Sequence, residues 1–468
     1  MTALVWFRRD LRVHDHPALR AAMDGHDEIV PVFCFDDRIL HGRHASGPRT
    51  QFMLECLADL NGSLQKRGGG LCLRHGPPEV ELLQLAEEVG ATEVHHTYDI
   101  SPFDRKRSAR VRQALSQRSI EVIEHPGLSV IDDVREMRTG AGGPYTVFTP
   151  FFRSWERQSR REPGAAPRAI NLPSGMEMGA PPSLGDLGLE HDITRPLPGG
   201  ETEGRKRMNR FLRKGVSDYA GNHDALGSDG TSRLSPYLRF GCISPLELEM
   251  HLESGEGAAA FRRQLCWRDF YQHVLNAFPR NAKSEFQERY RGKIRWSYAR
   301  GPFDAWTEGH TGYPLVDAGM RQLRLEGFMH NRARLVVGSF LTKDLGIDWR
   351  WGERWFMRFL LDGDEANNNG NWQWIASVGV DPQPAFRRIY NPARHLERFD
   401  PRGDYVRRYV PELRDVPDEY LPEPWKMPED LQRTAGCVIG RDYPEPIVDH
   451  AEARQKALAR FKADGSSR

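Results

Sequence analysis

The sequence lacks the features of a membrane protein and of a disulfide-bonded secreted protein. No apolar run approaches the ~18 residues that a membrane-spanning helix needs, and the N-terminus, MTALVWFRRDLR, turns basic too early for a secretory signal. The six cysteines include no CxxC pair, so neither a cysteine-bound zinc site nor a thioredoxin-type centre is expected, and no metal is predicted. We therefore expect a cytoplasmic protein whose cysteines are buried free thiols.

The chain also has almost no net charge. Its 66 Lys and Arg residues and 65 Asp and Glu residues give a formal charge of +1 over 468 residues. A value near zero neither favours nor excludes nucleic acid, because the clustering of charge decides that question. One cluster is present: seven arginines and only three acidic residues lie between Arg387 and Arg408. This cluster fits a DNA-binding surface and, equally well, a solvated loop.

A nicotinamide-binding motif is absent as well, since no GxGxxG follows the first predicted strand. The first part of the chain nevertheless alternates short apolar segments with amphipathic segments of helical length. Strands separated by such helices indicate a Rossmann-like, doubly wound parallel sheet, with any ligand beyond the carboxyl ends of the strands. We assign residues 1–128 to this α/β unit, with strands over 4–7, 28–35, 71–75, 93–98 and 120–125 and helices over 50–67, 78–89 and 103–117.

The remainder is divided by a stretch rich in proline and glycine. Residues 162–205 have no helical periodicity, which is typical of a connection between domains, and we assign 129–204 to an interdomain linker. Strand patterns are scarce beyond it, so residues 205–468 are predicted to form an all-α domain. Its predicted helices cover 205–215, 244–253, 258–277, 315–326, 329–343 and 351–361.

Tryptophan is concentrated in this second domain, with eight of the eleven residues between 267 and 374. Large aromatic side chains usually fill a core, and that interpretation holds for any single one of them. Core helices more often use Leu, Ile and Val, however, whereas indoles suit a flat cofactor or a flipped base. If residues 371–377 are helical, Trp372 and Trp374 project about 200° apart, as the helical period of ~100° per residue requires.

Polar groups near these tryptophans suggest a cofactor. Arg334 lies on a predicted helix and needs a partner if buried, and Asp362 and Asp364 precede three consecutive asparagines. Such groups can hydrogen-bond the polar edge of a flavin ring, while helix capping explains only one or two of them. The segment GTSRLSPYLRFG (230–241) places hydroxyls before a helix, as in a diphosphate site or an ordinary helix cap.

Taken together, the long motifs resemble the photolyase/cryptochrome family nearly end to end, most closely the bacterial class I-like cyclobutane-dimer photolyases. The motifs are LVWFRRDLRVHDHPAL (4–19), GTSRLSPYLRFG (230–241), WRDFY (267–271), TGYPLVDAGMRQL (311–323), MHNRAR (329–334), DGDEANNNGNWQW (362–374) and YNPARHLERFDP (390–401). The resemblance implies an α/β domain, a long linker and a helical domain that binds FAD.

The resemblance also implies roles for individual residues. The implied FAD contacts are Tyr219, Thr231, Ser232, Arg233, Leu234, Arg268, Asn331, Arg334, Asp362, Asp364 and Asn368, with Asn368 near flavin N5 and Arg334 paired with Asp362. The implied electron-transfer chain runs from Trp372 through Trp349 to Trp296 at the surface. Asn368 and Gln264 complete the catalytic set, and the implied DNA and dimer contacts are Gln264, Trp267, Tyr271, Arg332, Trp374 and Arg398.

The activity that the resemblance implies is that of a carbon–carbon lyase, which repairs cyclobutane pyrimidine dimers in UV-damaged DNA with light. We expect a monomer by default, since the sequence does not give the oligomeric state. Gln264 stands where many such enzymes have glutamate, which leaves a cryptochrome-type photoreceptor without repair activity as the alternative. A (6-4) photolyase ranks lower, because Asn331 and Leu335 occupy the places of its histidine pair.

The resemblance further implies that a second, light-harvesting chromophore can bind. The folate-type site uses a glutamate and a cysteine–lysine pair, but the matching places hold Ser101 and Ala282-Lys283. TYDISPF (97–103) and CFDDRIL (34–40) instead resemble the version that binds 8-hydroxy-deazaflavin. We therefore expect a deazaflavin-like or other flavin-like antenna, or an empty site.

Overall fold

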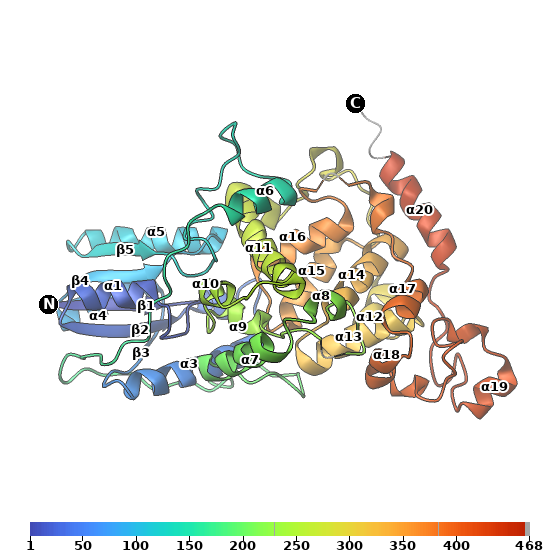
Figure 1. Ribbon diagram of the computed structural model, residues 1–468, viewed down its shortest axis with the longest axis horizontal. Helices are drawn as coiled ribbons and strands as arrows, with labels where there is room; N and C mark the ends of the chain where they lie inside the picture. Colours follow the sequence, from blue (N-terminus) through green and yellow to red (C-terminus); the bar gives the residue numbers. More distant parts are fainter. Residues whose placement is uncertain (229, 382, 464–468) are drawn as a thin grey trace.

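The computed structural model describes residues 1–228, 230–381 and 383–463, which form an α/β part and a helical part side by side (Figure 1). The α/β part contains one parallel sheet of five strands in the order β3-β2-β1-β4-β5. The predicted fold class is confirmed. The strands are β1 (Thr2–Phe7), β2 (Glu28–Phe35), β3 (Cys72–His75), β4 (Ala91–Thr97) and β5 (Glu121–His125).

Helices cover both faces of the sheet, as the alternation of its side chains requires. On β1, Leu4 and Trp6 face one buried cluster, while Ala3, Val5 and Phe7 face another. The first cluster includes side chains of α4 (Pro78–Val89) and α5 (Pro102–Ser116), and the second includes side chains of α1 (Pro17–Gly25) and α3 (Gly47–Gln65). The short α2 (Asp37–Leu40) follows β2.

Two of these helices differ from the sequence prediction because of their caps. The helix expected over 50–67 begins at Gly47, since the Ser46 hydroxyl accepts from the Arg49 amide and Pro48 lies in the first turn. Helix α1 was not predicted, and His16 caps it through an acceptor contact with the Leu19 amide. Its nine residues are too few to display a clear period.

The connection between the two parts is ordered against them. It contains one helix, α6 (Phe148–Glu156), and no helix or strand is assigned to residues 157–200. Backbone hydrogen bonds join it to both parts, from the Leu73 amide to Met178 and from the Arg195 amide to Leu325, at 2.7 and 2.8 Å. This segment is therefore packed along the protein surface rather than a free tether.

In the helical part, α11 and α16 pack against each other and lie side by side in Figure 1. One buried cluster continues from the α1–α3 face of the sheet into α7–α11, and a second fills the space among α12–α18. No helix among the described residues is long and apolar enough to cross a membrane. The helices are α7 (Glu201–Lys214), α8 (Tyr219–Asn222), α9 (Ser235–Arg239), α10 (Pro245–Met250), α11 (Glu256–Ala277), α12 (Arg300–Glu308), α13 (Pro314–Glu326), α14 (Asn331–Ser339), α15 (Trp349–Phe359), α16 (Glu365–Ala376), α17 (Pro392–Phe399), α18 (Asp404–Tyr409), α19 (Glu429–Thr434) and α20 (His450–Ala463).

Candidate cofactor and substrate site

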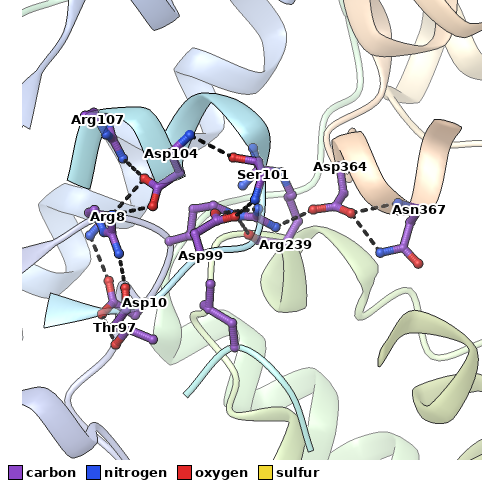
Figure 2. A network of polar contacts seen from close by, with 12 residues as sticks. Arg8, Asp10, Thr97, Asp99, Ser101, Asp104, Arg107, Arg239, Asp364 and Asn367 are labelled. Atoms are coloured by element: carbon purple, nitrogen blue, oxygen red, sulfur yellow. Dashed lines mark hydrogen bonds and ion pairs between the residues drawn. The ribbon is translucent and has the colours of Figure 1, made fainter. Parts of the chain in front are cut away.

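An ion-pair network joins the two parts where the first strand of the sheet ends, at the point where the strand order reverses (Figure 2). Arg9, just after β1, contacts Asp99 at 2.9 Å and also Asp364, which caps α16 in the helical part. Asp364 in turn accepts from the amide and side chain of Asn367 at 2.9 and 2.8 Å. Burial alone would raise the pKa of Asp364, but Arg9 and Arg239 hold it well below its usual range. The carboxylate is therefore charged at neutral pH.

A second ion pair lies beside it, between the two residues that the sequence predicted to pair. Arg334 donates to Asp362 Oδ2 at 2.7 Å, and the Ser235 hydroxyl donates to the same oxygen at 2.6 Å. This confirms the predicted Arg334–Asp362 pair. The Asp362 side chain is 7% exposed, and its other oxygen, Oδ1, is buried without a hydrogen-bond partner among the described residues.

The unpartnered oxygen of Asp362 is the observation that tests whether these residues fit a cofactor. Buried carboxylate oxygens nearly always have a donor, so Oδ1 calls for an N–H or O–H group of a bound molecule. A flavin nucleotide offers such donors on its ring, ribityl chain and ribose. The guanidinium of Arg334 and the hydroxyl of Ser235 fix the carboxylate in place, so the residues fit FAD.

The predicted diphosphate segment, residues 230–241, begins in the loop before α9 and includes that helix. Arg233 adopts a left-handed backbone conformation there, with φ of 51°, and pairs with Glu326 of α13 at 3.1 Å. The Ser232 hydroxyl accepts from the Leu234 amide at 3.3 Å. Thr231 is half-buried and immediately precedes this turn. The loop thus brings two hydroxyls and an arginine together, as the sequence indicated.

Three further predicted cofactor residues are engaged in protein contacts. Asn368 donates to the Glu353 carbonyl at 3.0 Å. Arg268 donates to the carbonyl of Leu238 at 3.2 Å and to that of Leu128. Tyr219 is buried against Phe211 and Phe261, whereas Asn331, the first residue of α14, is exposed.

The three tryptophans of the predicted electron-transfer chain belong to one hydrophobic cluster. Trp372 and Trp349 are buried, at 2% and 0% exposure, while Trp296 is half-buried. The ring of Trp372 contacts Phe356 and Trp306, with centroids 5.0 and 6.3 Å away. Trp296 was expected at the surface but is only partly exposed. The ring of Phe461 on α20 packs edge-on against it, with ring centroids 6.4 Å apart.

Two glycines, Gly338 and Gly352, leave room for the ring of Trp372, and Gly352 provides a stability test. A Cβ at Gly352 would lie 2.2 Å from Cη2 of Trp372 and 2.6 Å from Leu341. We expect Gly352→Ala to destabilise the protein by about 1–3 kcal/mol through overpacking. Gly301→Ala is also in a helix, but a Cβ there would meet no atom within 4 Å, so this variant should be neutral or stabilising by up to ~1 kcal/mol. Denaturant unfolding measures both variants, and equal effects would contradict this account of the packing.

The predicted dimer contacts on α11 lie beside α6. Trp267 stacks on Phe148 with centroids 3.6 Å apart and an interplanar angle of 3°, and it also contacts Tyr271 at 5.6 Å. One face of the Trp267 ring is therefore covered by protein. Tyr271 is buried, and Gln264, one helical turn before Trp267, is exposed.

The remaining predicted contacts lie on α14, α16 and α17. The Trp374 indole N–H donates to Asp381 at 3.2 Å, and the Arg388 guanidinium lies 4.1 Å above its ring. Trp374 and Trp372 therefore face different surroundings, as the helical period predicted; the helix ends at Ala376, before Ser377. The guanidinium groups of Arg332 and Arg398 lie 4.2 and 5.1 Å from the centre of the Phe399 ring, and Arg332 is also paired with Asp224.

A largely buried carboxyl beside Asp364 gives the site a pH-dependent stability. Burial, followed by the nearby carboxylates of Asp99, Glu353 and Asp364, raises the pKa of Glu365 to about 7. Because this folded-state value exceeds the unfolded value of 4.5, the contribution of Glu365 to stability is lost as the pH rises between the two. We expect Glu365→Gln to be more stable than the unmodified protein by about 1–3 kcal/mol at pH 8 and to lose this advantage near pH 5. Unfolding of both proteins at the two pH values measures the difference, and an advantage independent of pH would contradict it.

Sequence reasoning missed several side chains of this region. Arg9 lies in the first shared motif, and Ser235 follows the hydroxyls of the second, but their partners are distant in the chain. Phe148 belongs to YTVFTPF (145–151), which also resembles the family, but nothing in that motif predicted its contact with Trp267. Arg388 comes from the arginine cluster, and its burial over Trp374 excludes it from a solvated loop.

Comparison with known proteins is consistent with this arrangement. The model of the DNA photolyase family matches residues 3–169, and the model described as the FAD binding domain of DNA photolyase matches residues 261–463. A deoxyribodipyrimidine photo-lyase of Streptomyces griseus is 43% identical over 458 residues, which cover 97% of this chain and 98% of that protein.

Two solved structures resemble the whole chain. A bacterial class III photolyase from Agrobacterium tumefaciens superposes with a TM-score of 0.93 and 35% identity, covering 100% of this chain and 98% of that one. An archaeal photolyase from Sulfolobus tokodaii, determined with two FAD molecules, has a TM-score of 0.85 and 30% identity, covering 99% and 100%. The class I-like assignment is not confirmed, since one of these neighbours is a class III enzyme. The chain belongs to the DNA photolyase and cryptochrome family, and its helical part is the FAD-binding domain of that family.

Proposed function

We propose that this protein is a deoxyribodipyrimidine photo-lyase, which repairs cyclobutane pyrimidine dimers in UV-damaged DNA with the energy of light. The observation that carries this proposal is the match over 97% of the chain, at 43% identity, to an enzyme of that name. FAD in its reduced form would supply light absorption and a reversible transfer of one electron to the dimer. The protein supplies binding, orientation and electrostatics.

The side chains that would hold FAD are those gathered around Asp362. Arg334 and Ser235 orient the Asp362 carboxylate, whose free oxygen accepts from the cofactor. We assign the hydroxyls of Thr231 and Ser232 and the Arg233 side chain to the diphosphate, because they lie together in one turn. Arg9 fixes Asp364 from the α/β part, and the cofactor site is therefore tied to the position of both domains.

The dimer would lie between Trp267 and Trp374. Extruding a damaged base step costs a few kcal/mol, and stacking on an aromatic side chain contributes roughly 1–3 kcal/mol per base. Phe148 covers one face of the Trp267 ring and the Arg388 guanidinium lies over one face of the Trp374 ring, so a base would stack on the opposite face of each indole. We assign Arg332 and Arg398, which both contact the Phe399 ring, to the DNA phosphates.

Trp372, Trp349 and Trp296 are proposed to carry electrons to the flavin. The burial of the first two, the greater exposure of the third and their place in one aromatic cluster support the assignment. Indole loses an electron far more readily than phenylalanine or an aliphatic side chain, which gives such a row a use beyond packing.

A flavin-like antenna is the second chromophore that we propose. Ser101 stands where the folate-type site has a glutamate, and it offers no carboxylate. Its hydroxyl instead caps α5. The archaeal neighbour was described with two FAD molecules and a novel light-harvesting cofactor, which supports a flavin-like group rather than folate. An absorption spectrum of the chromophores released from the purified protein tests this choice, and a folate spectrum would contradict it.

The repair activity is tested with the purified protein carrying fully reduced FAD, mixed with UV-irradiated DNA. We expect dimers to disappear under blue light and to persist in matched samples kept in the dark. Dimers that survive strong illumination, with the flavin shown to be reduced, would contradict repair. Equal affinity for damaged and intact DNA would then favour the photoreceptor alternative that Gln264 left open. The monomeric state and the cytoplasmic location stay predictions.

A further inference from the structure

A group of histidine and glutamate side chains lies in the α/β part, away from the proposed flavin and DNA sites. His26 follows the last turn of α1, and Glu93 and His95 are two residues apart on β4, so their side chains share one face of the sheet. Each offers a metal-binding atom, and these atoms all lie within 4.8 Å of one another. The proposed function uses none of these residues.

The distances between these atoms suit a metal ion. His95 Nε2 lies 2.9 Å from Glu93 Oε2, and His26 Nε2 lies 3.8 Å from the same oxygen. Zinc–nitrogen bonds of about 2.0–2.1 Å in a tetrahedron separate neighbouring ligand atoms by about 3.3 Å. The observed distances fall on both sides of this value, so small side-chain rotations bring all three atoms to one ion.

Burial and neighbouring contacts prepare both imidazoles as ligands. Each imidazole is only 4% exposed, whereas the Glu93 side chain is 29% exposed and leaves one side open to water. His26 Nδ1 lies 3.2 Å from the Ala22 carbonyl and donates to it, which leaves the Nε2 lone pair free. His95 Nδ1 lies 3.0 Å from His125 Nε2. Such outer contacts orient the ligating histidines in known metal sites.

The charges around the group favour a cation. Glu121 on β5 is the register partner of Glu93 on β4, so two carboxylates stand on adjacent positions of the sheet. Like charges at paired positions repel and destabilise a sheet. A divalent ion between the strands and α1 removes that repulsion.

We propose that His26, Glu93 and His95 bind one divalent transition-metal ion of the zinc class, with water completing the coordination, and that the ion fastens the end of α1 to β4. Two imidazoles with one carboxylate favour Zn²⁺, Co²⁺ or Ni²⁺ over Mg²⁺ and Ca²⁺, which prefer oxygen ligands. The cysteine pattern of the sequence predicted no metal. His26 is distant in the sequence from Glu93 and His95, and the three residues form no spacing motif that would have suggested a site.

The test is a metal titration of the full-length holoprotein, produced without a histidine tag and stripped with a chelator. We expect one equivalent of Zn²⁺ to bind, Co²⁺ to give the ligand-field bands of a tetrahedral site, and Zn²⁺ to raise the unfolding temperature. Mg²⁺ at the same concentration should neither bind stoichiometrically nor raise the unfolding temperature. Absence of stoichiometric binding of Zn²⁺, Co²⁺ and Ni²⁺ to the unmodified protein would overturn the proposal.

Variants assign the binding to these residues. His26→Ala and Glu93→Gln should each abolish the cobalt bands, and His125→Ala should weaken binding roughly 10–100-fold, as loss of an outer partner does. His75→Ala is the matched control. His75 and His41 lie 2.9 and 3.9 Å from Asp37, so these three residues form an exposed group that also has two imidazoles and one carboxylate. Binding lost in His75→Ala but kept in His26→Ala and Glu93→Gln would contradict the site. Unfolding of the metal-free variants shows whether each one folds, and Glu93→Gln is the conservative change should His26→Ala fail to do so.

Discussion

Trp372→Phe is expected to lose light-driven reduction of bound FAD by about 100-fold or more, which corresponds to at least about 2.7 kcal/mol of barrier. Phenylalanine fills most of the same space, but its ring is far harder to oxidise than indole. In the proposed chain Trp372 is the last step before the flavin, and the indole of Trp306 beside it lies outside that chain. The rate of flavin reduction under blue light, with an external electron donor in excess, measures the effect.

The matched control for this variant is Trp306→Phe. Trp306 is also buried, and its ring packs edge-on against that of Trp372 with centroids 6.3 Å apart, but it lies outside the proposed chain. We expect it to keep most of the photoreduction, whereas Trp349→Phe should lose it. Photoreduction that fails in Trp306→Phe and survives in Trp349→Phe would redirect the electron path through α12. Repair by the chemically reduced Trp372→Phe protein should persist, because the chain only recharges the flavin.

The fold was largely predictable from the sequence because its signals are local. The alternation of short apolar strands with amphipathic helices predicted all five strands of the parallel sheet to within two residues at their ends. The helix α16 carried a weaker signal, since Asn367, Asn368, Asn369, Gly370 and Asn371 all have poor helix propensity. Its stability comes from packing against α11 and from the Asp364 cap, which are tertiary contacts.

The candidate site was predictable where partners share a motif or a known resemblance, and not elsewhere. Arg334 and Asp362 were paired correctly, although 28 residues separate them. Arg9 and Asp364 are 355 residues apart, and no periodicity relates them. Similarly, the stacking of Phe148 on Trp267 depends on how α6 lies on α11, which neither helix encodes by itself.

Asp362→Asn is expected to weaken FAD binding by about 10- to 150-fold, since a hydrogen bond to a charged group contributes about 1.5–3 kcal/mol. The carboxylate has one oxygen occupied by Arg334 and Ser235 and the other free for the cofactor. Asparagine has a single acceptor oxygen, so it cannot serve both sides, and its NH₂ group meets a donor. FAD content after purification and titration of the flavin-depleted protein with FAD, followed by flavin fluorescence, measure the loss.

Two comparisons separate a lost cofactor contact from a general loss of stability. Asp24→Asn also removes an aspartate paired with an arginine, Arg20 at 3.1 Å, but this pair is exposed on α1 of the α/β part, which carries none of the proposed FAD contacts, so FAD binding should not change. Ser235→Ala removes one donor to Asp362 and leaves the ion pair intact, so it should weaken FAD binding less than Asp362→Asn does.

If Asp362→Asn bound FAD as tightly as the unmodified protein, then Oδ1 would have another partner, and the cofactor would not lie against this carboxylate. If Asp362→Asn lost FAD and also unfolded in the flavin-free state at lower denaturant than Asp24→Asn, the loss would reflect the broken Arg334 pair. Retained apoprotein stability together with lost FAD is the outcome that assigns Oδ1 to the cofactor.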